Sequence, residues 1–173
     1  MLAKYYRKKG FVVAAQDEAT FGLLPQIVKG WAKKGSRPIM IQHPQNKCMN
    51  VFGARSKRCF VFFFCKKKKP KKFVAFLNLL LKKWGRVCLF TDNAPWHKGE
   101  KVVAFLEAHQ KTFRLIRFPK YAPELNPTES CWKPARSDVR NRLIHSLPTL
   151  RYHLCNIFSN PSLMPKMFSY LSG

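Results

Sequence analysis

The sequence predicts one α/β domain, a mixed β-sheet with helices packed against it. Short apolar runs follow one another in the first half of the chain, and strand-like and helix-like segments alternate in the second half. The length of 173 residues suits a single folded unit with a substantial core. We therefore treat residues 1–173 as one domain without an inner boundary.

The first half of the chain is expected to supply four strands. An apolar run that ends at Gln16 and Asp17 is typical of a buried strand. Residues 21–38 are rich in glycine and proline and indicate a connection. The basic turn Arg55–Arg58 separates two further apolar runs and predicts a hairpin. The expected strands are Phe11–Ala15, Ile39–Gln42, Met49–Ala54 and Cys59–Cys65.

In the second half, helical periodicity alternates with strand-like runs. Pro70 is placed to begin a helix in which apolar residues recur every three or four positions up to Trp84. A buried-strand run later ends at Thr91 and Asp92. From Asn126 the pattern is helical to the end, with interruptions expected at Pro134, Pro148, Pro161 and Pro165. The intervening elements are a strand at Val87–Phe90, a helix at Lys98–Gln110 and a strand at Phe113–Phe118.

The charge of the chain indicates a polyanionic partner. Lysine and arginine number 33 against 8 aspartate and glutamate residues, a net charge of +25 that is spread from Lys4 to Arg151. Nucleic acid and an anionic membrane surface are the two usual candidates. The membrane is the weaker one, because Cys59–Cys65 and Phe73–Leu81 are far shorter than the roughly 18 to 20 residues of a spanning helix.

Three further features have ordinary interpretations. The Lys66–Lys72 run is expected to be a solvated loop rather than a DNA clamp or a localisation signal, because charge runs usually lie on the surface. Met1–Gly10 is too polar for a secretion signal. The six cysteines show neither a C-x-x-C pair nor zinc-ligand spacing to histidine, which favours a reduced, intracellular chain with free thiols.

Acidic residues are scarce, so their positions are informative. Asp17 and Asp92 each follow a buried-strand run, which places both carboxylates at strand ends where α/β sheets gather ligands. Either residue alone is equally consistent with a turn or cap. Glu129 is the third residue after Asn126 in a capping-box pattern with Pro127 at the first helical position, so cap and ligand stay open for it too.

The three carboxylates together favour a metal site. Two carboxylates about 4 Å apart repel by roughly 4 kcal/mol at an effective dielectric near 20, so a cluster of three calls for a cation. On this argument, Asp92→Asn would leave the metal-free protein at least as stable. Carboxylate oxygens with open positions suit Mg²⁺ or Mn²⁺, and a pair of such ions supports attack on a phosphodiester.

Five segments carry a family resemblance. They are Gln16–Gly22, Trp31–Pro38, Asn50–Ala54, Thr91–His97 and Phe118–Trp132. The most specific part is the Tyr-x-Pro-Glu-Leu-Asn-Pro-x-Glu-x-x-Trp string that ends at Trp132. In this order the segments resemble the catalytic domain of mariner-superfamily transposases, with the bacterial insertion-sequence branch most similar, and the likeness runs from about Phe11 to Leu154.

The resemblance implies an RNase H-like fold, with Asp17 on the first strand, Asp92 just past the fourth and Glu129 on a following helix. It implies two Mg²⁺ or Mn²⁺ ions on these residues, hydrolysis at transposon ends, and attack of the freed 3′-hydroxyl on target DNA. The implied partners are transposon-end and target DNA, with a second copy of the chain as a candidate. The location would be the nucleoid-containing cytoplasm of a bacterium or the nucleus of a eukaryote.

The resemblance also suggests residues around the site. His97 lies beside it as a contact to DNA or phosphate, although an ordinary residue near a helix start is as good an interpretation. Trp31 and Trp132 are expected in the core rather than stacked on bases. The other expected contacts to DNA or phosphate are Asn93, Lys33, Lys34 and Arg37.

The chain departs from the family pattern in two ways. The helix-turn-helix modules that read transposon ends are missing, since only Met1–Gly10 precede the first expected strand. The chain is thus expected to be a truncated copy or half of a transposase whose DNA-binding half comes from a separate reading frame. Pro134 lies where the family continues the helix of Glu129. The alternatives are an inactive remnant that only binds nucleic acid, and a ribonuclease or repair nuclease.

Overall fold

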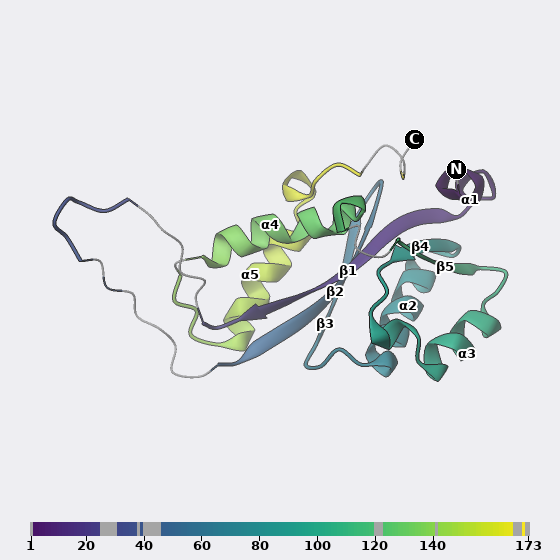
Figure 1. Ribbon diagram of the computed structural model, residues 1–173, viewed down its shortest axis with the longest axis horizontal. Helices are drawn as coiled ribbons and strands as arrows, with labels where there is room; N and C mark the ends of the chain where they lie inside the picture. Colours follow the sequence, from purple (N-terminus) through teal and green to yellow (C-terminus); the bar gives the residue numbers. More distant parts are fainter. Residues whose placement is uncertain are drawn as a thin grey trace.

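A five-stranded mixed sheet forms the centre of the molecule in the computed structural model, with strand order β3-β2-β1-β4-β5 (Figure 1). The structure describes residues 2–24, 31–37, 39, 46–119, 123–140, 142–167 and 171. Strands β1 to β3 are antiparallel, whereas β4 and β5 run parallel to β1. The strands are β1 (Val12–Gly22), β2 (Cys48–Ser56), β3 (Phe60–Cys65), β4 (Val87–Thr91) and β5 (Phe113–Arg117).

The expected mixed sheet and its hairpin are therefore confirmed, but the first strand is longer than predicted. β1 does not end at Gln16 and continues through Asp17 to Gly22. Its pairing with β2 persists because Ala19 and Phe21 keep the alternate face buried after the continuous apolar run stops. The expected strand at residues 39–42 lies largely outside the described residues, and Ile39 itself is exposed.

Helices cover both faces of the sheet. One core lies between the sheet and α2, with Phe52, Phe73 and Phe76 among its buried members. A second core on the other face joins Trp132 of α4 to Phe158 of α5 and Phe60 of β3. The helices are α1 (Leu2–Lys8), α2 (Pro70–Trp84), α3 (Glu100–Ala108), α4 (Pro127–Val139) and α5 (Leu147–Ser159), with 3-10 turns η1 (Pro95–His97), η2 (Pro123–Leu125) and η3 (Pro161–Leu163).

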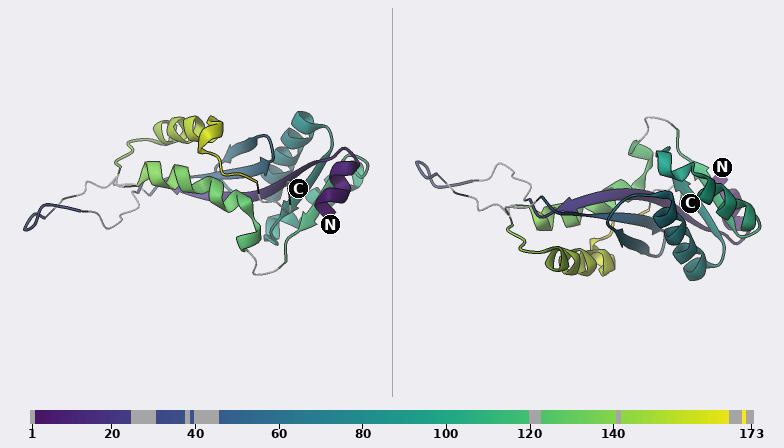
Figure 2. Two further views of the ribbon diagram at one scale, coloured as in Figure 1. Left: turned by 90° about the horizontal axis from the view of Figure 1, so that it is seen from above. Right: turned by 90° about the horizontal axis from the view of Figure 1, so that it is seen from below.

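The pairs of helices lie toward different ends of the sheet. Helices α4 and α5 pack beside one another and contact β1 and β3, while α2 and α3 contact one another near β4 and β5 (Figure 1; Figure 2). The close approach of α4 requires Gly53 of β2, because a Cβ there would lie 2.5 Å from the Trp132 ring. The part of the sheet around Asp17, which pairs with Gly53, is thus covered tightly by the helix that carries Glu129.

Three further predictions were wrong. Helix α1 was missed, because its seven residues bury only Ala3 and show little apolar periodicity. Pro134 lies inside α4 without ending it. Trp31 is fully exposed, whereas Trp132 is buried as expected.

The chemistry of the rest of the chain agrees with the sequence. All six cysteines are free thiols. Within the described residues, every helix falls short of the length and apolarity needed to cross a membrane.

Candidate metal centre

Asp17 lies under the first turn of α4. Its Oδ2 accepts a hydrogen bond of 2.7 Å from Nε1 of Trp132. Burial raises the pKa of Asp17, the hydrogen bond from Trp132 opposes this, and the negative charge of Glu129 adds to it, so that the pKa is about 7. Asp17 and Glu129 are therefore close enough to interact, and their repulsion has no full compensation from the described side chains.

The N-terminus of α4 is fastened to the strand that carries Asp17. The Asn126 side chain donates to the backbone oxygen of Gln16 at 3.0 Å, and Thr128 Oγ1 donates to that of Ala15 at 2.8 Å. The Asn126 side chain also accepts from the Thr128 amide, which confirms the predicted helix cap. Glu129 follows these anchors directly and is exposed. The cap is therefore what brings Glu129 to Asp17, so the two interpretations of this motif are compatible.

Asp92 follows β4 on the strand next to β1. The parallel pairing of these strands ends at Ala15 opposite Phe90. Asp17 and Asp92 each lie two residues past this pair, but their side chains have different partners: Asp17 accepts from Trp132 of α4, whereas Asp92 contacts His97, which also binds Glu18. Asp92 is also the turn residue that its alternative interpretation predicts, because its Oδ1 accepts from the Ala94 amide at 3.0 Å.

A buried network on the other side of Asp92 includes Glu18, which the sequence did not single out. Glu18 Oε1 accepts from Nε2 of His97 at 2.8 Å, from Nε2 of Gln16 at 2.8 Å and from Nε1 of Trp96 at 3.1 Å. Its side chain is only 4% exposed. The available signal was strand alternation, since neighbours on a strand face opposite sides of the sheet and Glu18 directly follows Asp17.

His97 links Glu18 to Asp92. Its Nδ1 lies 3.1 Å from Asp92 Oδ1, and its ring packs 4.2 Å from that of Phe73. Burial alone would lower the pKa of His97, but hydrogen bonds and charge interactions with Asp92 and Glu18 raise it to about 9. At neutral pH the ring is therefore an imidazolium that donates to two carboxylates.

The same charge keeps Asp92 ionised. Partial burial opposes the charged form, but hydrogen bonds from His97 and Ala94 hold the pKa of Asp92 below its ordinary value. The Asp92 side chain is half exposed, at 50%. Contacts from the described residues engage its Oδ1, which leaves Oδ2 for an outside partner.

Glu18, Asp92 and His97 also have ligand atoms that all lie within 4.8 Å of one another. A metal ligand must offer a lone pair, and both ring nitrogens of a protonated His97 donate instead. Without a metal ion, this compact group is held together as an ion-pair network. Among the predicted ligands, Asp92 belongs to the group, whereas Asp17 and Glu129 do not.

The other predicted contacts are spread around this region. Asn93 donates from Nδ2 to the backbone oxygen of Phe118 at 3.2 Å, which ties the β4 turn to the end of β5. His97 is 1% exposed and Asn93 half-buried, so in this structure both support the Asp92 turn. Lys33, Lys34 and Arg37 are exposed on the described segment 31–37, and the structure does not bring them together with the carboxylates.

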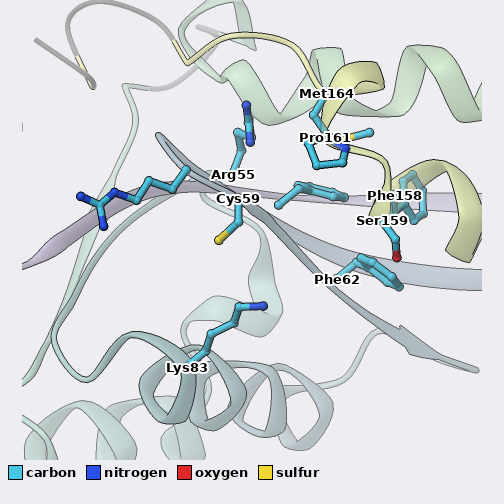
Figure 3. Close-up of a pocket in the computed structure, with 10 residues that line it drawn as sticks. Arg55, Cys59, Phe62, Lys83, Phe158, Ser159, Pro161 and Met164 are labelled. Carbon is cyan, nitrogen blue, oxygen red and sulfur yellow. The ribbon is translucent and has the colours of Figure 1, made fainter.

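A separate cavity of about 320 Å³ lies at the hairpin end of β3. Figure 3 shows Arg55 above the strands and Lys83 on the helix below them, with Phe62 and Phe158 to the right. Arg55 donates from Nε to the backbone oxygen of Pro165 at 3.0 Å, so it holds the C-terminal segment. The lining includes no carboxylate, which separates this cavity from the candidate metal centre.

The family follows from comparison with known proteins. A family model described as DDE superfamily endonuclease matches residues 12–151. The chain belongs to this family. Curated proteins include no match to the chain.

Solved structures show the fold of this DDE domain. A pre-cleavage Mos1 transpososome has a TM-score of 0.71 at 17% identity, over 94% of this chain and 54% of that one. The catalytic domain of Mos1 mariner transposase has a TM-score of 0.65 at 16% identity, over 94% of this chain and 78% of that one. The expected RNase H-like fold is thus confirmed. The DDE domain spans about half the length of the Mos1 chain in the transpososome.

Proposed function

We propose that this DDE domain is the catalytic domain of a DNA transposase, with Asp17, Asp92 and Glu129 as the ligands of two Mg²⁺ or Mn²⁺ ions. The substrates are phosphodiester bonds at transposon ends and in target DNA. The Tyr121–Trp132 string favours the insertion-sequence branch of the mariner superfamily. A second copy of the chain and a separate DNA-binding half are the further partners in this proposal.

The observation that carries the proposal is the fastening of α4 to β1. Hydrogen bonds from Asn126 and Thr128 to the strand backbone bring Glu129 beside Asp17. Asp92 follows β4, the parallel neighbour of β1. The proposal adds that a bound cation draws Asp92 together with Asp17 and Glu129, three scarce carboxylates on a chain whose net charge is +25.

The residues fit divalent cations. Asp17 is a largely buried carboxyl that Glu129 repels, and a cation between them would relieve that repulsion. Asp92 is already ionised through His97 and has one oxygen left to offer. Two such ions, when bound, activate an attacking water or 3′-hydroxyl and stabilise the leaving oxygen. The chain itself holds the carboxylates in place and supplies positive surface for the DNA backbone.

Structures of similar fold are consistent with this chemistry. They include Mos1 mariner paired-end complexes with Mn and with Mg, and a Mos1 complex with the left transposon end. The transfer of metal and DNA from those proteins to this chain is part of the proposal, because their identity to it is below 20%.

Nicking of a supercoiled plasmid tests the proposal. We expect the purified chain to nick DNA with Mn²⁺ or Mg²⁺ and to lose this activity in EDTA. Asp17→Asn, Asp92→Asn and Glu129→Gln should each abolish nicking, whereas Glu107→Gln, which removes an exposed carboxylate from α3, should leave it unchanged.

Two results would contradict the proposal. Binding to plasmid DNA without metal-dependent nicking would favour the binding remnant. Preferential cleavage of RNA-containing substrates by the same three carboxylates would favour a ribonuclease.

A further inference from the structure

A groove with an apolar floor and a basic rim lies between the end of β3 and the start of α5. Its volume is about 750 Å³, within the roughly 300 to 1,000 Å³ of pockets that bury small ligands. Its apolar lining residues, which we call the floor, include Met49, Phe64, Leu147 and Pro148. Its basic lining residues, which we call the rim, are Lys66, Lys67, Lys69, Lys72 and Arg151. The lining has no acidic residue, so its occupant must tolerate five positive charges and also offer an apolar surface.

The rim is continuous with the candidate metal centre. Lys68 belongs to the same loop, lies 5.7 Å above the Trp96 ring and contributes to the low pKa of Asp92. Its neighbours Lys67 and Lys69 line the groove instead. Cys65 in the groove wall is also within electrostatic reach of Glu18. A polyanion that extends from the candidate metal centre along these lysines would therefore reach the groove.

Phe64 and Arg151 offer surfaces in the groove on which a flat ring could stack. Phe64 is partly buried, and the Arg151 guanidinium lies 5.2 Å from its ring centre. Unpaired bases stack on such aromatic and guanidinium surfaces, whereas the bases of an intact duplex are stacked on one another and present phosphates outward. A second copy of this chain would bring the same positive charge to the rim.

We propose that this groove receives an unpaired base of a nucleic-acid strand whose phosphates lie on the basic run Lys66–Lys72, which comprises the β3–α2 connection and the first turn of α2. The choice of nucleic acid rests on the proposed function. The groove would hold a strand that has separated from its complement near the cleavage position. The Lys66–Lys72 run, which the sequence predicts to be solvated, would then be part of a nucleic-acid-binding surface.

The test measures affinity and fluorescence in EDTA, where cleavage plays no part. Three labelled DNAs of equal phosphate number are compared: a blunt duplex, a duplex with a single-stranded overhang containing 2-aminopurine, and the same overhang with abasic sites. We expect the base-containing overhang to bind about tenfold more tightly than the abasic one, the order of one stacking contact. The 2-aminopurine emission should fall on binding.

Variants locate the effect. Phe64→Leu keeps an apolar side chain and should remove the preference for the base and the fluorescence change, while duplex affinity is retained. Arg151→Ala should weaken overhang binding more than Lys111→Ala, which removes an equal charge next to β5 at the opposite edge of the sheet. Circular dichroism melts of each variant identify any loss of folding, and Arg151→Ala is the decisive variant if Phe64→Leu does not fold.

Equal affinity for the base-containing and abasic overhangs would overturn the proposal. Displacement of DNA by an acidic amphipathic peptide, with sensitivity to Phe64→Leu but no base preference, would assign the groove to a protein and overturn it as well. Because nicking is not measured, base-dependent binding by a chain that fails to nick would uphold the groove while contradicting the proposed catalytic function.

Discussion

Asp17 and Asp92 each lie two residues past the last paired residue of adjacent strands, but the burial and the charge environment of the two side chains are opposite. Asp17 is largely buried, its pKa is raised to about 7, and the largest charge interaction that acts on it is repulsion by Glu129. Asp92 is half exposed, its pKa is lowered, and a buried imidazolium donates to it. One carboxylate thus carries its counter-charge within the fold, and the other lacks one.

In the proposed metal centre, this difference would give the two residues separate roles in cation binding. Asp92 is ionised before a metal binds, because protonated His97 donates to it. This arrangement requires a buried ion pair between His97 and Glu18. Asp17 must lose a proton near neutral pH, so metal affinity should rise as the pH passes through about 7. The predictions below probe each half of this comparison.

The largest effect is expected from removing the positive charge of His97, which lies beside Asp92. His97→Ala leaves the 4%-exposed Glu18 carboxylate without its charged partner, and breaking a buried pair from one side costs about 3 to 5 kcal/mol. Urea denaturation at pH 7 measures this loss. The double variant with Glu18→Gln is the control and should recover part of the stability. A loss below about 1 kcal/mol would mean that the network does not hold Asp92.

The Asp17 side should show the opposite dependence on pH. A carboxyl whose folded pKa is raised contributes stability that is present below its unfolded pKa and is lost as pH rises through the folded value. Between pH 4 and 7, the metal-free protein should therefore lose up to about 4 kcal/mol relative to Asp17→Asn. Denaturation of both proteins at several pH values measures the difference, and parallel curves would place Asp17 in an ordinary environment.

Asp92→Asn should have a smaller effect on the metal-free protein. The repulsion argument from the sequence anticipated no loss, but the contacts of Asp92 with His97 and Ala94 change that expectation. Because the side chain is half exposed, we expect a loss of about 1 kcal/mol. Thermal melts in EDTA measure it, and a more stable variant would restore the original argument.

The smallest effect concerns the far half of α4. Pro134 lacks the amide that would donate to the preceding turn, so Pro134→Lys should raise Tm by a few degrees, the equivalent of about 1 kcal/mol. The first turn is anchored independently by Asn126 and Thr128, so the pH dependence due to Asp17 should not change. A Tm that stays constant or falls would show that the surrounding backbone already accommodates the proline.

Much of the fold could be predicted because the spacing of apolar residues and the positions of proline and capping residues are local properties of the sequence. The apolar runs and Pro70 located most strands and α2, and the Asn126 cap located the start of α4. The extent of β1 could not be predicted, since pairing with β2 carries it through polar residues. The Glu18 network also required tertiary structure, because Gln16, Trp96 and His97 meet Glu18 only after β1 and β4 become neighbours.

The most direct test of the central claim is the Mn²⁺-induced change in Tm at pH 6 and pH 8, for wild type, Asp17→Asn and Asp92→Asn. An ion stabilises a protein only by preferring the folded state. We predict a shift in wild type that is larger at pH 8, where Asp17 is ionised, and no shift in either variant. Equal Mn²⁺ shifts in all three proteins, or a wild-type shift that does not depend on pH, would contradict the assignment of Asp17 and Asp92 as differently prepared ligands of one metal centre.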